Sequence, residues 1–131
     1  MTKGIVDIIK NTERLVKNME GDSYKEQYRG RFSGYTSRIN ATSEPFDPEN
    51  AYAEVRLTTR DGREYEALFM TRAYMDYLFD KNKKTGENAS GIYLAIEDKI
   101  DVEKITNETI KITIDELIEK LRVESFFREI D

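Results

Sequence analysis

The stretch AEVRLTTRDGREYEALFMT, residues 53–71, decides the fold, because two runs of alternating apolar and polar residues flank an Asp-Gly turn signal. A two-residue loop at Asp61 and Gly62 would place Leu57 opposite Glu66, which mixes apolar with charged positions. A three-residue loop over residues 60–62, with Gly62 in the left-handed bulge position, separates the two faces. We therefore expect a bulged β-hairpin that pairs Ala53 with Phe69, Val55 with Ala67, Leu57 with Tyr65 and, on its polar face, Arg56 with Glu66.

The residues after this hairpin predict a helix and then a second hairpin. Thr71 is a suitable N-cap for a helix that should end near Lys84, where the polar segment 80–88 interrupts it. Residues 91–96 (GIYLAI) are typical of a mostly buried strand, and residues 99–103 alternate apolar with charged side chains. A turn at Glu97 and Asp98 would join these strands.

The C-terminal part predicts a helix over residues 107–122. Thr106 can cap it, and its apolar residues share one face: Ile110, Ile114, Leu117, Ile118 and Leu121. A rival interpretation takes residues 110–114 as a strand followed by a helix that is capped at Thr113. Opposite charges at helical spacing, such as Glu108 with Lys111 and Lys111 with Asp115, favour the longer helix. Residues 123–130 should add a further short helical segment.

The N-terminal part predicts a helix, a strand and a loop. An apolar stripe from Ile5 to Met19 indicates a helix over about residues 4–20, which Gly21 would end. Residues 28–41 are rich in aromatic residues, serine and threonine and contain two glycines, which favours a bent strand. The segment 43–50 carries both prolines of the chain and should be a surface loop.

These elements describe an α+β protein in the order α-β-β-β-α-β-β-α, with about five mostly antiparallel strands and helices on one face. The length of 131 residues favours a single domain over residues 1–131. The order of elements, the small size and the acidic pI resemble type III secretion chaperones and similar small dimeric binding domains. The resemblance is one of element order, without a shared residue motif.

Composition excludes several classes of active site. The chain has no histidine and no cysteine, so it has neither a Ser-His-Asp nor a Cys-His site, and no zinc site of the usual ligands. The lack of disulfides fits a reducing compartment, and no signal peptide or membrane-spanning apolar run is recognisable. We expect a cytoplasmic protein with no cofactor, no small-molecule ligand and no membrane contact.

Two groups of residues have some features of a catalytic or metal site, but neither has suitable spacing. Gly86 and Gly91 stand as far apart as the glycines of a phosphate loop, but residues 92–93 are Ile-Tyr where Lys-Ser/Thr is required. Four carboxylates lie within residues 97–103, but no glycine-bent loop wraps them around an ion. We expect no catalytic residue and no metal ligand, and a Mg²⁺-dependent enzyme is the least favoured function.

The best candidate for a binding surface is the arginine-rich part of the strand predicted over residues 28–41. Residues 27–43 contain arginines and no acid, and the candidate binding residues are Arg29, Arg31, Phe32, Tyr35 and Arg38. The same pattern also suits a structural strand whose aromatic residues enter the core. Tyrosine and arginine are common anchors of protein interfaces, so we expect a non-catalytic protein-binding domain of inhibitor, immunity or chaperone type, with a protein partner or a homodimer. The alternative is RNA or single-stranded DNA binding through Arg29–Arg38.

Overall fold

The computed structural model describes residues 23–96 and 99–130, which fall into two compact units that divide after Ser33. In the first unit, residues 23–32 form a helix. The helix predicted over residues 4–20 and its end at Gly21 lie outside the described residues. The expectation of one domain over the whole chain stays a prediction.

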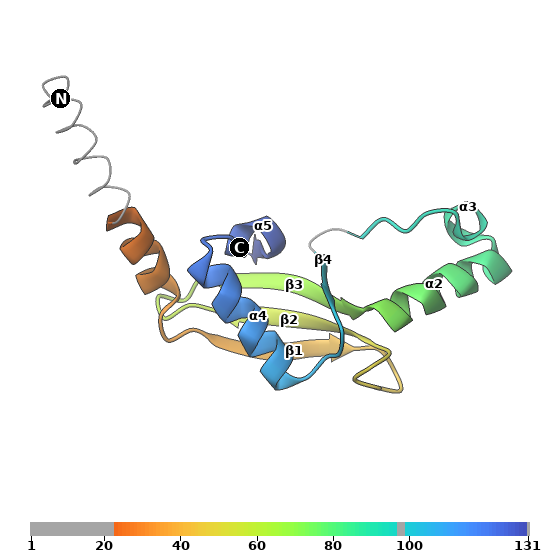
Figure 1. Cartoon of the computed structure of the whole chain (residues 1–131), viewed down its shortest axis with the longest axis horizontal. Helices are drawn as coiled ribbons and strands as arrows, with labels where there is room; N and C mark the ends of the chain where they lie inside the picture. The colour runs from red at the N-terminus through yellow and green to blue at the C-terminus, as the bar shows by residue number, and fades with distance from the viewer. Residues whose placement is uncertain (1–22, 97–98, 131) are drawn as a thin grey trace, which may run out of the picture. The chain divides into compact units, whose positions relative to one another are not determined.

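The second unit is built on a five-stranded sheet (Figure 1). Three strands follow one another as antiparallel neighbours: β1 (Thr36–Thr42), β2 (Tyr52–Thr58) and β3 (Glu64–Thr71). Two short strands share the other edge of β3: β4 (Lys99–Val102) lies parallel to its C-terminal half, and β5 (Arg128–Ile130) lies antiparallel to its N-terminal half. The predicted α+β fold with a mostly antiparallel sheet is confirmed.

The central hairpin has the predicted register, with Arg56 opposite Glu66 and Leu57 opposite Tyr65. Its turn is closed by two backbone bonds, from the Thr59 amide to the Arg63 carbonyl at 2.9 Å and from the Gly62 amide to the Thr59 carbonyl at 3.0 Å. Gly62 has a φ of 91°, as the bulged turn requires. Inward residues of β2 and β3 are buried while outward ones are half-buried, so side-chain alternation fixes the register.

Helix α2 (Arg72–Thr85) follows β3 without a loop. The buried side chain of Thr71 accepts hydrogen bonds from the amides of Tyr74 at 3.1 Å and Ala51 at 3.0 Å, so it caps the helix and also fixes the start of β2. Gly86, with a φ of 86°, ends the helix close to the predicted position. The chain therefore leaves the end of the sheet along α2 (Figure 1).

The predicted strand at residues 91–96 is wrong. Residues Glu87–Gly91 form the short element α3, in which Asn88, Ala89 and Ser90 have left-handed φ values of 50°, 52° and 59°. Gly91 packs so closely on α2 that an added Cβ would lie 2.7 Å from the carbonyl oxygen of Phe79. The predicted second hairpin is wrong as well, because β4 pairs with β3 in the parallel direction, which a crossover connection permits and a hairpin turn does not.

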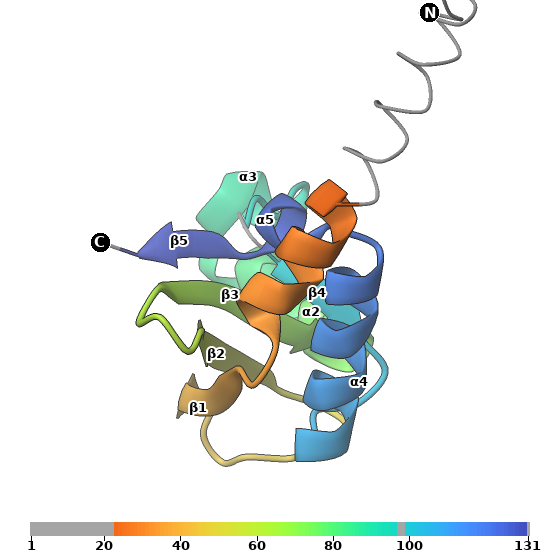
Figure 2. The same cartoon turned by 90° about the vertical axis from the view of Figure 1, so that its left-hand side faces the viewer.

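Helix α4 (Asn107–Glu119) lies across one face of the sheet and is followed by the short helix α5 (Val123–Phe126) (Figure 2). The Thr106 hydroxyl accepts a hydrogen bond from the Thr109 amide at 3.0 Å, so the predicted cap and helix are confirmed and the rival strand is wrong. The ring of Phe127 meets that of Phe69 edge-on at 6.2 Å. The core between helices and sheet contains Val55, Leu57, Tyr65, Phe69, Ile110, Ile114, Val123 and Phe127.

Candidate binding surface on the open face of the sheet

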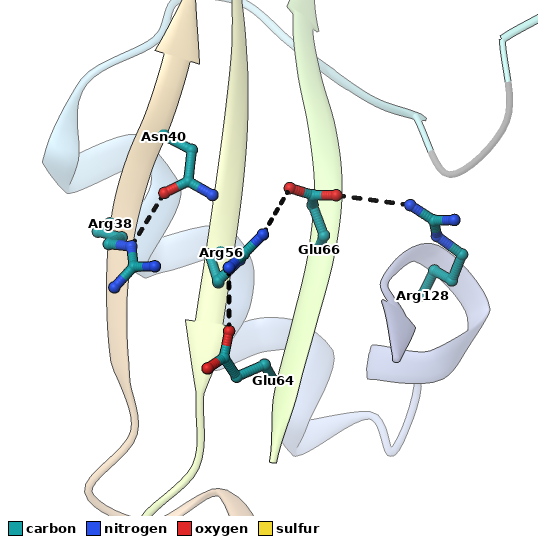
Figure 3. Close-up of polar contacts among 6 residues, drawn as sticks. All are labelled: Arg38, Asn40, Arg56, Glu64, Glu66 and Arg128. Carbon is teal, nitrogen blue, oxygen red and sulfur yellow. Dashed lines mark hydrogen bonds and ion pairs between the residues drawn. The ribbon is translucent and has the colours of Figure 1, made fainter. Parts of the chain in front are cut away.

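The face of the sheet opposite α4 is here called the outer face. Within residues 34–96 and 99–130 no helix lies across it (Figures 1 and 2). Strand pairing aligns four charged residues across it, one from each of β1, β2, β3 and β5, in the order Arg38, Arg56, Glu66 and Arg128. We call these four residues the charged row (Figure 3).

Ion pairs hold most of the charged row in place. The Arg56 guanidinium donates to Glu66 at 3.4 Å and to Glu64 at 3.1 Å, and Arg128 donates to the other oxygen of Glu66 at 3.5 Å (Figure 3). Glu66 is 16% exposed and Arg56 is 25% exposed, so both partners lie against the sheet rather than extending into solvent. Such partly exposed pairs contribute at most about 1 kcal/mol each, but a network reduces the motion of its members.

A second carboxyl group adds to this network. Glu54 and Glu66 share a hydrogen bond, which raises the pKa of Glu54 and lowers that of Glu66. When Glu54 is protonated, its carboxyl donates and the Glu66 carboxylate accepts, because Arg56 and Arg128 stabilise the negative charge on Glu66. As the pH falls, Glu54 therefore loses its negative charge before an isolated glutamate would.

Arg38 lies at the end of the charged row and differs from the other arginines. Its Nε donates to Asn40 in the same strand at 2.9 Å (Figure 3). Among the described residues no carboxylate forms an ion pair with it, and its cross-strand neighbour is the cation Arg56. Directly opposed like charges destabilise a sheet. Arg38 is thus an exposed cation at a position that the fold alone does not favour.

Three tyrosines form a cluster where β2 begins and α2 follows β3. The ring of Tyr52, on β2, meets that of Tyr74, on α2, edge-on, with 5.4 Å between the ring centroids. The ring centroids of Tyr74 and Tyr77 lie 5.3 Å apart. Tyr77 is 49% exposed. Partial burial, together with the two neighbouring tyrosines, raises the pKa of Tyr74. The outer face thus combines paired charges with aromatic side chains.

The five residues predicted as a binding strand do not lie along one strand. Residues 28–32 belong to the helix at residues 23–32, and strand structure begins only at Thr36, so the prediction of a strand over residues 28–35 is wrong. The physical reason is an aromatic ladder at helical spacing, in which the rings of Tyr24 and Tyr28 lie 6.2 Å apart and those of Tyr28 and Phe32 lie 5.2 Å apart.

Each of these five residues has a different environment. Phe32 is fully buried, and the guanidinium of the half-buried Arg31 lies 4.8 Å from its ring. Arg29 is half-buried on the same helix. Tyr35 precedes β1 and donates its hydroxyl to Asp115 at 2.7 Å. Arg38 alone lies on the open sheet.

Tyr35 connects the start of β1 to α4. Its partner Asp115 also accepts from Lys111 at 2.6 Å, and the Lys111 ammonium lies 6.0 Å from the centre of the Tyr35 ring. Partial burial and the hydrogen bond to Asp115 raise the pKa of Tyr35 well above its usual range. Burial alone would raise the pKa of Asp115, but its bonds to Lys111 and Tyr35 lower it on balance. Tyr35 therefore acts as a structural connection.

The acidic segment, residues 97–103, does not form a metal site with its described residues. Glu97 and Asp98 lie outside the described residues, and Asp101 forms an ion pair with Lys99 at 2.7 Å. Among the residues that the structure describes, no group of three or more acidic side chains is arranged to hold a metal ion. The described part of the chain also contains no helix long and apolar enough to cross a membrane.

The sequence did not reveal most of the outer face. The Arg56 and Glu66 pair followed from the hairpin register, but Arg128 belongs to a strand of only 3 residues that no periodicity could indicate. The tyrosine cluster had a detectable signal, because Tyr74 and Tyr77 are three residues apart on a predicted helix. Comparison with protein-family models, curated proteins and solved structures found no match to this chain.

Proposed function

We propose that this protein is a protein-binding domain and that it binds its partner through the outer face of the sheet. The observation that carries the proposal is the charged row, which lies preformed and partly exposed on a face that no helix of the second unit covers. A rigid polar surface loses little conformational entropy when a partner binds. Tyr52, Tyr74 and Tyr77 add aromatic area, which interfaces use as anchors.

The balance of charges on the outer face favours a protein partner over nucleic acid. Two of the three arginines in the charged row already contact Glu64 or Glu66, so a phosphate would have to compete with a carboxylate. Phe32, one of the candidate binding residues, is fully buried, so its ring is not available to stack on a base. Proteins carry both signs of charge and so complement such a surface better than a polyphosphate does.

Affinity purification of the tagged protein from its native cell tests this proposal. We expect a protein partner that withstands nuclease treatment and is lost when Arg56→Glu breaks the charged row. The matched control is Lys104→Glu, which makes the same charge change at an exposed residue that follows β4, and it should retain the partner. Recovery of a second copy would identify a homodimer. Recovery of nucleic acid alone, or only of a lone monomer, would contradict the proposal.

A further inference from the structure

Strand β1 is the open edge of the sheet. It stands at the end of the strand order β1-β2-β3-β4, and no other described segment pairs with its second side. Residues 36–41 are all exposed. An edge strand of this kind presents unpaired backbone N–H and C=O groups that can pair with an added strand.

The side chains of β1 specify what such a strand should carry. Arg38, on the outer face, faces Arg56 and has no carboxylate partner among the described residues. A carboxylate arriving opposite Arg38 on its open side would offset this repulsion. Ile39, on the opposite face, pairs with Val55 and is 36% exposed, so it can contact an apolar side chain. Pairing with β2 is regular from Thr36 to Ile39 and is then interrupted by a bulge at Asn40.

From these observations we propose that the edge of β1 over Thr36–Ile39 accepts an extended acidic segment of the partner protein, which adds to the sheet as a further strand. One carboxylate of this segment lies opposite Arg38. The residues next to it in the segment are apolar, because successive side chains of a strand face opposite sides and theirs lie on the face of Ile39. The inference rests on the proposed function and names the kind of partner segment that it requires.

Two synthetic peptides test the inference with the full-length protein. In one, glutamates alternate with valines, and in the other, lysines replace the glutamates. Fluorescence anisotropy at low salt measures their affinities, and hydrogen exchange locates the binding site. We expect the glutamate peptide to bind and to slow exchange at the amides of residues 36–39. Arg38→Glu should weaken it by about fivefold and should strengthen binding of the lysine peptide, whereas Lys104→Glu should change neither.

The outcomes separate this inference from the proposed function. Equal affinities for the two peptides, protection away from β1, or no binding at all would overturn the inference. Arg38 would then serve only to keep two sheet edges apart, and its replacement by an apolar residue would cause self-association without any change in peptide binding. If affinity purification still recovers a protein partner in that case, the proposed function stands without this mode of binding. Circular dichroism of each variant confirms that it is folded.

Discussion

Replacing Arg38 by glutamate should stabilise the protein. Arg38 lies directly opposite Arg56 in the antiparallel pair of β1 and β2, so the substitution converts a like-charge pair into an opposite-charge pair. Cross-strand pairs of this kind contribute about 0.2–1 kcal/mol. Because Arg56 already shares its charge between Glu64 and Glu66, we expect a gain of about 0.5 kcal/mol, in the lower half of that range. For a chain of this size the gain corresponds to an increase of about 2 °C in the melting temperature.

Urea unfolding at low and at high salt measures this effect. At low salt the free energy of unfolding should rise, and the gain should disappear at about 1 M salt, where the screening length falls to about 3 Å. Lys104→Glu changes the net charge by the same amount without a cross-strand partner, so it serves as the control. A loss of stability in Arg38→Glu, or a gain that does not depend on salt, would refute the reasoning about repulsion at this edge.

Three further changes test other parts of the structure. Glu54→Gln should raise stability at neutral pH by about 0.5 kcal/mol. The raised pKa of Glu54 means that its hydrogen bond to Glu66 contributes at low pH and is lost as the pH rises through that pKa, whereas glutamine donates at every pH. The advantage should shrink in acid, and a pH series of urea unfolding checks this. Thr71→Val removes the helix cap and the bond to Ala51, so it should lower the free energy of unfolding by about 2 kcal/mol. Gly30→Ala should stabilise the helix at residues 23–32 by about 1 kcal/mol, since nothing lies within 4 Å of the new Cβ, and no gain in thermal unfolding would contradict the helix.

The parts of the fold that were predicted correctly have strong local signals. In the hairpin, side-chain alternation and the turn at Gly62 both indicate one register, which the pairing of Val55 with Ala67 confirms. Helix α4 was recognisable from its cap at Thr106 and from its apolar stripe. Each of these signals acts over a few residues and does not depend on distant contacts.

The incorrectly predicted elements lie where the composition of a segment favours one secondary structure and its packing favours another. Gly30 and the aromatic residues near it favoured a strand, but Tyr28 and Phe32 contact each other at helical spacing. The apolar run after Gly91 read as a buried strand, although Ile92 is 81% exposed. The crossover through α2 determines that β4 pairs with β3 in the parallel direction. A single sequence contains no local signal that predicts this pairing.

Only part of the candidate site could be predicted from the sequence. Arg38 was predicted as a binding residue and lies on the exposed edge strand, and the opposition of Arg56 and Glu66 followed from the register. The charged row as a whole needs β5, which brings Arg128 from the C-terminal end of the chain to Glu66 across 62 positions of sequence. The residues of the charged row form one surface only in the folded sheet.

Site-specific photo-crosslinking in the native cell is the most direct test of protein binding through this sheet. A photoreactive amino acid replaces Thr36, which is exposed on β1, and, in a control variant, Lys104. We predict a covalent adduct with a protein from position 36 that survives nuclease treatment, together with none from position 104. No protein adduct from position 36, or an adduct there that nuclease removes, would contradict the claim that this sheet binds a protein.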